Sequence, residues 1–369
     1  MSISQQEFQR RHSAVRELMK KGNLDCILIA GLADNFNRGN IRYITGSGRG
    51  EYCIFPIEKP PIFLVGQNQT ASPKLRRTIG ALDLLELKEP TNPLELVIQE
   101  LTRCDNGNKI GIIGMGCISV SAYLAIKEKF KDRLIDASDI FEQLRIVKSP
   151  EEIEKMRRAA HITDRICNRL REIIRPGLID YEIYGEVKKN IFAMGCEYSF
   201  DLIDAEGAMM NMSFYPVGDR LEANGTLFME ITPAYEGYYA QLPISLPVGS
   251  YAPHVRQMVD AWEKAIAAGL EVLRPGTKVS EVYYTLINTI KQQGLLSPYR
   301  PGHAIGLDVI DFWSITESNN TILKPGMTLA IHPSVLQKIG GDGIGMGYTY
   351  LITDNGAEKL SGINLASFG

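Results

Sequence analysis

A pattern that occurs twice in the second half of the chain constrains the fold more than any other feature. The segments LREIIRPGLIDYEIYGEVKKNIFAMG and LEVLRPGTKVSEVYYTLINTIKQQG share a helix, Arg-Pro-Gly, a capped helix and a closing Gly. Proline and glycine end one helix before the next begins, and two copies are too few for a repeat array. The pattern therefore predicts a pseudo-symmetric α+β unit in which each helical pair is followed by strands.

The first part of the chain has a different pattern of helices and strands. Helical periods over residues 5–21, 94–103 and 119–130 alternate with short apolar runs, which are DCILIAG, YCIFPI, PIFLVG, DLLELK and KIGIIG. Short apolar strands separated by helices are typical of an α/β layer arrangement. We therefore expect an α/β domain here.

The boundary between the two parts falls near residues 145–148. Ser149-Pro150-Glu151-Glu152 has the features of a helix start, because serine caps the free amides, proline fits the first turn and acids suit the helix dipole. We predict an α/β domain over residues 1–147 and an α+β domain over residues 148–369.

Composition narrows the possible partners and compartment. The chain has 369 residues, 44% of them hydrophobic, and a net charge of −3, which favours neither nucleic acid nor an anionic membrane as a partner. Its first residues, MSISQQEFQRRHSAVRELMKKG, lack the apolar core of a secretory signal, and no run of about 18 apolar residues predicts a membrane span. Six cysteines without CxxC spacing predict free thiols and a reducing cytoplasm.

Several segments resemble the creatinase/aminopeptidase P/prolidase family (M24), in the order in which that family has them. They are NIRYITGSG, RIVKSPEEIEKMRRAAHITD, YEGYYAQLPISLPVG, PGHAIGLDVID, LKPGMTLAIHPSV and YLITDNGAEKLSG. The resemblance spans nearly the whole chain. It implies the two-domain pita-bread fold, with an α/β N-terminal domain and an α+β catalytic-type domain.

In the peptidases of this family, the resemblance implies two metal ions held by two Asp, one His and two Glu. Carried over position by position, the two Asp fall on Glu230 and Gln241, and the His is kept as His303. The first Glu becomes His332, and the last falls on Gly347 or its neighbour.

This replacement argues against a dinuclear centre. Two divalent ions a few ångströms apart repel each other unless carboxylates bridge them, and neutral residues now stand at Gln241, His332 and Gly347. A single ion is a different case, because Glu230, His303 and His332 have the two-His-one-carboxylate composition that Zn or Fe accepts. We expect no cofactor, with a single divalent metal on those three residues as the alternative.

Creatinase itself, which the resemblance implies works without metal, uses a histidine base that this chain lacks. The corresponding segment is GAMMNMSFYPVGD, where the base position falls near Ser213 and Phe214, and a second family histidine is Ile310. Imidazole titrates closest to neutrality, so His332 is the leading candidate for the catalytic base and His303 the second. Glu230 is expected to orient one of them or to bind the substrate.

Other residues are predicted to hold the substrate. The resemblance to creatinase implies that Arg49 reaches the active site, there that of a neighbouring subunit, and guanidinium suits a substrate carboxylate. Arg300 is a weaker candidate of the same kind. The further predicted substrate contacts are Gln241, Ser213, Phe214, Tyr348, whose hydroxyl is expected to fill space left by metal, and Asp311. Met209, Met210 and Met212 suggest an apolar pocket wall or ordinary core.

These residues predict a homodimeric, metal-independent enzyme that cleaves a C–N bond in a small amino-acid-like or guanidino compound. One alternative is a mononuclear-metal dipeptidase or Xaa-Pro peptidase-like hydrolase. The other is a protein of this fold that binds a small molecule without turning it over.

Overall fold

A computed structural model describes residues 3–74, 78–207 and 212–368 of the chain. The chain divides into two compact units, Met1–Ile146 and Val147–Gly369. In the described ranges no helix is both long enough and apolar enough to span a bilayer.

The first unit is built on a six-stranded mixed sheet with strand order β4-β3-β2-β1-β5-β6. The central strand β1 runs antiparallel to β2 and parallel to β5. This arrangement confirms the predicted α/β class. The strands are β1 (Leu24–Ala30), β2 (Tyr52–Pro56), β3 (Ile62–Leu64), β4 (Glu86–Lys88), β5 (Lys109–Ile113) and β6 (Leu134–Asp136).

Helices pack against this sheet because β1 is apolar apart from Asp25 and every one of its residues is buried. Side chains of α4 and α5 join Cys26, Leu28 and Ala30 in one core cluster. Phe8 and Val15 of α1 are also buried. The helices are α1 (Gln5–Gly22), α2 (Gly39–Thr45), α4 (Pro93–Cys104), α5 (Val120–Phe130) and α6 (Ser138–Arg145).

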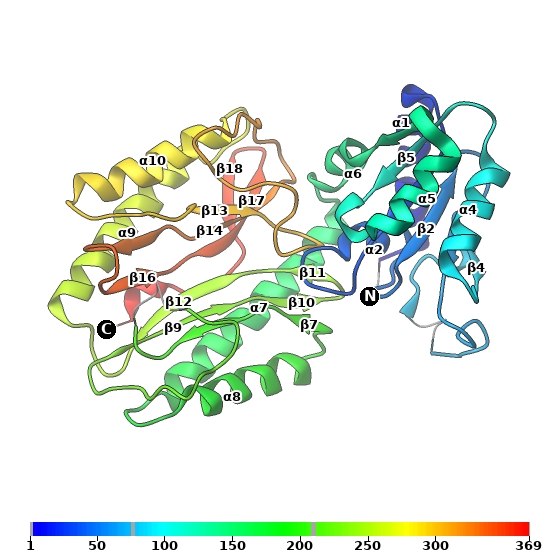
Figure 1. The fold of residues 1–369 in the computed structure, drawn as a ribbon. Helices are drawn as coiled ribbons and strands as arrows, with labels where there is room; N and C mark the ends of the chain where they lie inside the picture. Colours follow the sequence, from blue (N-terminus) through cyan, green and yellow to red (C-terminus); the bar gives the residue numbers. More distant parts are fainter. Residues whose placement is uncertain (1–2, 75–77, 208–211, 369) are drawn as a thin grey trace. The chain divides into compact units, whose positions relative to one another are not determined.

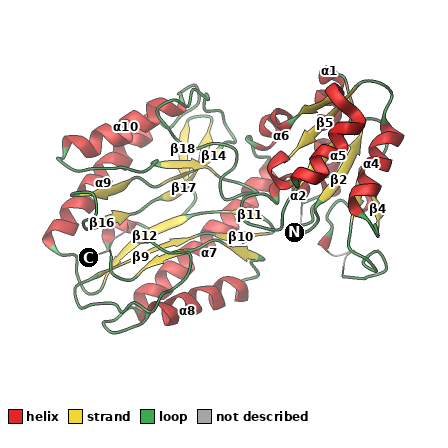
Figure 2. Cartoon of the chain, viewed as in Figure 1, coloured by secondary structure: helices red, strands yellow, loops and turns green. Residues whose placement is uncertain are grey.

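The second unit contains the two predicted helical pairs. Its strands lie between the pair α7 and α8 and the pair α9 and α10, as Figures 1 and 2 show. The pairs are α7 (Pro150–Ile173) with α8 (Asp180–Ala193), and α9 (Pro253–Val272) with α10 (Val279–Gln292). The Arg-Pro-Gly turns require glycine, because Gly177 and Gly276 have φ of 84° and 89°, which side chains rarely adopt.

The strands of the second unit form several small antiparallel sheets. Their orders are β11-β10-β7, β12-β9-β8, β13-β14-β17-β18 and β15-β16. The strands are β7 (Tyr198–Ser199), β8 (Leu202–Asp204), β9 (Thr226–Ile231), β10 (Pro233–Tyr235), β11 (Tyr238–Tyr239), β12 (Leu242–Pro247), β13 (Gly302–Ala304), β14 (Thr328–Ile331), β15 (Ser334–Leu336), β16 (Gly343–Gly345), β17 (Tyr348–Thr353) and β18 (Gly356–Lys359).

The first helix of this unit starts as its sequence predicts. The Ser149 hydroxyl accepts the backbone amide of Glu152, and the Glu152 carboxylate accepts the amide of Ser149 at 2.8 Å. This capping box satisfies two amides that a helix start leaves free.

Candidate active site

Strands β9 and β12 bring Glu230 and Gln241 together. The two strands are antiparallel, with Glu230 opposite Pro243, so Gln241, the residue before β12, lies near the end of β9. Gln241 Nε2 donates to Glu230 Oε1 at 2.7 Å, and both residues are buried. Thr349 holds the glutamine backbone, since its hydroxyl accepts from the Gln241 amide and donates to the Gln241 carbonyl.

His303 on β13 extends this contact into a chain of three side chains. Its Nδ1 lies 2.9 Å from the carbonyl oxygen of Ala304, and its Nε2 lies 3.1 Å from Gln241 Oε1. Because a carbonyl only accepts, Nδ1 carries the proton of a neutral ring and donates to Ala304. Nε2 is then an acceptor, so it bonds to Gln241 only when the amide nitrogen faces it. The structure places Glu230, Gln241 and His303 in a chain within hydrogen-bond distance of one another.

Burial favours the neutral forms of the two end groups of this chain. Burial raises the pKa of the Glu230 carboxyl to about 7, while the Arg300 charge acts in the opposite direction. Burial lowers the pKa of His303 to about 4. A protonated Glu230 can donate to Gln241 Oε1, and the Gln241 amide can then donate to His303 Nε2 once it has turned over. All three side chains are satisfied in that arrangement without a net charge.

His332 follows β14 and lies against His303. Their ring centroids are 5.2 Å apart in an edge-to-face arrangement, and the His332 amide donates to the carbonyl of Pro301 at 2.8 Å. Burial lowers the pKa of His332 well below 6.5, helped by the charges of His303 and Arg300. Its Nε2 is buried and has no hydrogen-bond partner among the described residues.

Gly347, at the position of the last family carboxylate, has no room for a side chain. A Cβ built there would lie 2.2 Å from the carbonyl oxygen of Ile331 and 2.4 Å from the Cβ of His332. Real Cβ atoms do not approach backbone atoms so closely, so a carboxylate at this position would require the strands to move. The predicted loss of this ligand thus has a steric basis.

The residues present do not fit the pair of metal ions that the family implies. The Glu230 carboxylate and the His303 ring are joined to the Gln241 amide, and position 347 offers no ligand. Within the described ranges, no three His, Cys, Asp or Glu side chains are grouped so that they could hold a metal ion. Glu230, His303 and His332 therefore do not converge as a ready-made ligand set either.

Arg300 is the charged residue that acts on all three of these groups. Its positive charge lowers the pKa of Glu230, His303 and His332. The side chain is exposed and forms no ion pair or hydrogen bond with any other described residue. Arg300 is predicted only as a weaker candidate than Arg49, and no local sequence pattern indicates its effect on these buried groups.

Asp311 is not open to a substrate. Its carboxylate pairs with Lys148 Nζ at 2.9 Å, and both side chains are 1% exposed. The predicted substrate contact at Asp311 is therefore corrected, since a buried cation from the start of this unit occupies the carboxylate. Lys148 is not among the predicted site residues, because no local sequence pattern indicates a pair 163 residues apart.

Tyr348 also differs from its prediction. Its hydroxyl accepts the backbone amide of Leu365 at 2.8 Å, and its ring contacts Trp262 and Lys359. The hydroxyl therefore ties down the C-terminal segment and does not fill the position of a metal. The next residue on β17, Thr349, is the one that contacts the site, because its hydroxyl accepts the backbone amide of Gln241.

The remaining predicted contacts lie on loops. Ser213 bridges to Ile203 of β8, and Phe214 is 58% exposed with its ring 5.6 Å from that of Phe200. Arg49 is exposed in the first unit, in a turn held by Ser47. Met212 packs partly buried against Leu202 and Phe228, while Met209 and Met210 lie outside the described residues.

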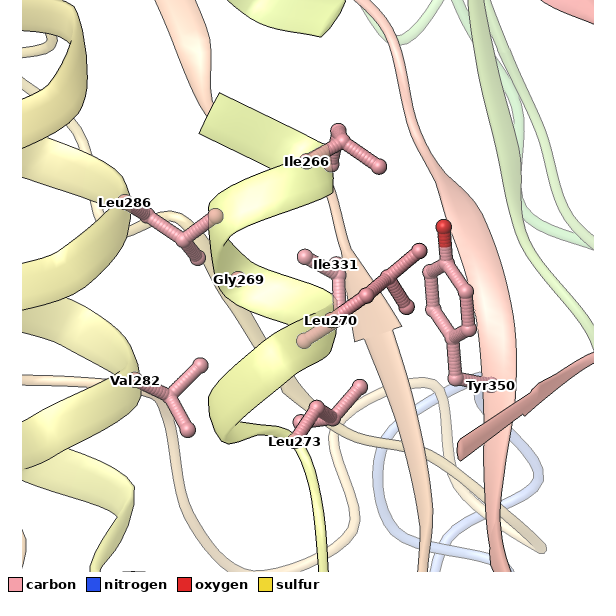
Figure 3. A pocket seen from close by; sticks show the side chains of 8 residues that line it. All are labelled: Ile266, Gly269, Leu270, Leu273, Val282, Leu286, Ile331 and Tyr350. Atoms are coloured by element: carbon pink, nitrogen blue, oxygen red, sulfur yellow. The ribbon is translucent and has the colours of Figure 1, made fainter. Parts of the chain in front are cut away.

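A separate crevice in this unit is apolar. It lies between α9, α10 and strands β14 and β17, and Figure 3 shows the side chains that line it. Leu270, Leu286 and Tyr350 are among them, and no acid or base contributes. Its lining offers no carboxylate, imidazole or ammonium group to activate a polar substrate, so the candidate site remains the one around Glu230.

Comparison with solved structures defines the class of fold. The chain superposes on dipeptidase PepE from Mycobacterium ulcerans with a TM-score of 0.83, covering 99% of this chain and 98% of that one at 21% identity. It also superposes on the prolidase from Pyrococcus horikoshii with a TM-score of 0.82 at 20% identity, covering 96% and 99%. The chain therefore has the two-domain pita-bread fold that its sequence implied.

Comparison with family models and with related sequences identifies the family. Residues 154–354 match Metallopeptidase family M24, and residues 11–147 match the Creatinase/Prolidase N-terminal domain. The chain belongs to metallopeptidase family M24. It is 27% identical over 390 residues to an uncharacterized hydrolase/peptidase of Sinorhizobium fredii, covering 96% of this chain and 94% of that protein. It is 25% identical over 356 residues to the Xaa-Pro dipeptidase of Pyrococcus horikoshii, covering 94% and 95%.

Proposed function

We propose that this protein is a metal-independent hydrolase that cleaves a C–N bond in a small amino-acid-like compound. The observation that carries the proposal is the hydrogen-bonded chain from Glu230 through Gln241 to His303. In that chain the Gln241 amide lies between Glu230 and His303. Glu230 is the only carboxylate at the family's ligand positions, and His303 is the only ligand that is unchanged. The M24 relatives support hydrolysis as the reaction type.

In this proposal Glu230, and not His332, is the general base. A catalytic base works best when its pKa lies near the working pH, and the pKa of Glu230 is about 7 whereas that of His332 is well below 6.5. The Glu230 carboxylate takes a proton from water as the water oxygen bonds to the substrate carbon. It then gives that proton to the leaving nitrogen as the C–N bond breaks.

The histidines have supporting parts in this scheme. His303 is held by Ala304 and Gln241, so it fixes the position of the amide that binds Glu230. The free Nε2 of His332 can accept a hydrogen bond from the attacking water or from the substrate.

The second candidate is a mononuclear-metal Xaa-Pro peptidase. The near full-length match to the Xaa-Pro dipeptidase of Pyrococcus horikoshii favours it. Glu230, His303 and His332 would hold the ion, which would polarise a substrate carbonyl. The Gln241 amide would first have to leave the space between Glu230 and His303, because it bonds to both.

Elemental analysis of protein purified without chelators separates the two candidates. Our proposal expects less than about 0.1 equivalent of Zn, Fe or Mn, and no loss of activity with EDTA. One equivalent of metal that EDTA removes together with activity would favour the mononuclear peptidase.

Turnover is tested with a panel of dipeptides, N-acyl amino acids and guanidino acids, followed by mass spectrometry. Glu230→Gln should lower kcat by at least ~100-fold, because the amide cannot take a proton. The exposed Glu222→Gln is the matched control and should leave kcat unchanged. Binding without turnover by the wild type would instead identify a non-catalytic binding protein.

The proposal places this enzyme in the cytoplasm as a homodimer. Six free cysteines, of which five are buried, suit a reducing compartment. We keep residues 1–147 and 148–369 as its two functional domains, in line with the two compact units. Light scattering of the full chain tests the dimer.

A further inference from the structure

Lys148 and Asp311 form an ion pair in the interior of the second unit. Lys148 Nζ lies 2.9 Å from the Asp311 carboxylate, and both side chains are 1% exposed. The free energy of removing two charges from water largely offsets their attraction, so a buried pair is weak evidence for stability by itself. The contacts around this pair show which part of the chain it holds in place.

The backbone of Lys148 is fixed as well as its side chain. Its amide donates to the carbonyl of Gly326 at 2.8 Å, just before β14, and the neighbouring Val147 forms a bridge to Met327. The lysine side chain therefore extends to Asp311 from a fixed point. Because one partner of the ion pair is anchored, the pair can hold the other partner in position.

The Asp311 backbone contacts the peptide group that orients His303. The amide of Asp311 donates to the carbonyl oxygen of Ala304 at 2.9 Å, and His303 Nδ1 lies 2.9 Å from the same oxygen. A carbonyl oxygen has two lone pairs, so it can accept both N–H groups at once. The carbonyl that binds the His303 ring is thus also the one that Asp311 holds.

The turn that follows β13 packs closely against the ion pair. A Cβ added to Gly306 would lie 2.4 Å from Asp311 Oδ2 and 2.8 Å from Lys148 Cε. The Gly306 carbonyl also accepts the amide of Tyr239 on β11 at 2.8 Å. Displacing the ion pair would therefore displace this turn, because no free space separates the two.

We infer that Lys148 and Asp311 are positioning residues for His303. Their ion pair holds the Asp311 amide on the Ala304 carbonyl, and that carbonyl keeps the His303 proton on Nδ1. His303 Nε2 then remains the acceptor that faces Gln241. The inference rests on the proposed function, because it assigns the ion pair to the chain of side chains that ends at the catalytic base.

Nitrogen-15 NMR of the full chain with labelled histidine reports the His303 tautomer at neutral pH. In a neutral imidazole the protonated and unprotonated nitrogens have well-separated shifts, and a ring that exchanges between tautomers gives averaged values. The chain has five histidines, so His303 is assigned from the signals that His303→Gln lacks. The wild type should show one tautomer, with a slowly exchanging proton on Nδ1. Averaged shifts, or a proton on Nε2, would overturn the inference.

The variant that tests the ion pair is Lys148→Met combined with Asp311→Leu, which leaves no isolated buried charge. Its His303 shifts should become averaged, and the Nδ1 proton should exchange with water at least ~10-fold faster. On the best substrate of the panel, kcat should fall ~10-fold or more with little change in KM, because both side chains are closed off from substrate. Unchanged His303 shifts in this double variant would overturn the inference even if kcat fell, since the pair would then have a purely structural role.

Two further variants complete the comparison. Gly306→Ala displaces the pair without removing a charge, so it should alter the same His303 signals, and it decides the question if the double variant does not fold. Arg157→Met removes a partly exposed ion pair with Glu358 in the same unit. It is the matched control and should leave the His303 signals and kcat unchanged.

NMR shifts and turnover are recorded separately, so the two proposals can fail separately. If the double variant loses the Nδ1 tautomer but the wild type turns over no compound in the panel, the hydrolase is rejected and the positioning of His303 stands. Turnover by the wild type, together with unchanged His303 shifts in the double variant, would do the opposite.

Discussion

The Cβ of His332 lies where the side chain of residue 347 would begin. A Cβ on Gly347 would come within 2.4 Å of it, and within 2.2 Å of the Ile331 carbonyl oxygen. Two of the replaced ligand positions, 332 and 347, are thus in direct contact. The backbone at Ile331 and His332 can lie this close only because residue 347 is a glycine.

Gly347→Ala should therefore destabilise the protein by about 1–3 kcal/mol, the usual range for overpacking. Urea denaturation measures this free energy of unfolding. Gly185→Ala in α8 is the matched control, because nothing lies within 4 Å of the added carbon, and it should be neutral or stabilising by up to about 1 kcal/mol. A Gly347→Ala protein as stable as the wild type would show that the strands separate easily here.

Gln241→Met should cost about 1–3 kcal/mol of unfolding free energy, because it leaves both Glu230 and His303 without their shared partner. Adding Glu230→Met to this variant should recover part of the loss, since a buried polar group is then removed. The double-mutant cycle measures the coupling between the two residues. Strictly additive losses would mean that the Gln241–Glu230 hydrogen bond contributes nothing.

The stability difference between the wild type and Glu230→Gln should depend on pH. The native pKa of Glu230, about 7, lies above the ordinary value of 4.5. The native state therefore binds the Glu230 proton more tightly than the unfolded state does. The resulting contribution to the free energy of unfolding is complete below pH 4.5 and is lost as pH rises through 7.

Over that window the stability of the wild type relative to Glu230→Gln should fall by up to about 3 kcal/mol. The lowered pKa of His303 makes stability rise with pH between pH 4 and 6.5, which opposes the effect of Glu230. Because His303 is present in both proteins, subtracting the stability of the variant isolates the contribution of Glu230. Urea denaturation at pH 5 and pH 8 provides both values. A difference that stays constant or grows with pH would mean that Glu230 is ionised in the native state throughout.

Lys148→Met should destabilise the protein by about 3–5 kcal/mol, because the buried Asp311 carboxylate then loses its cation. Lys148→Met combined with Asp311→Leu should be closer to the wild type, since no isolated charge remains. Thermal unfolding of the three proteins tests this. If the single variant kept the wild-type melting temperature, the pair would not be structurally important, and Asp311 would again be a candidate for substrate contact.

The sequence predicted the α/β sheet of the first unit and the paired helices of the second, because both are local patterns. Apolar runs form strands, and Ser149 and Gly177 mark a helix start and a helix end whatever the chain does elsewhere. The site was predicted less completely. Glu230, Gln241 and His303 do meet, but Asp311 and Tyr348 have other partners, Lys148 and the Leu365 amide, which no local pattern indicates.

By itself the sequence determined which side chains stand at the family's ligand positions, and therefore how few carboxylates are available for cations. That is a matter of residue identity at motif positions and needs no coordinates. Only the tertiary structure decided how those side chains behave. Burial moves the pKa of Glu230 up and that of His332 down, because low-polarity surroundings disfavour charge. Packing places the backbone of residues 331–332 against Gly347. This contact depends on how the strands pack, and the sequence alone does not indicate it.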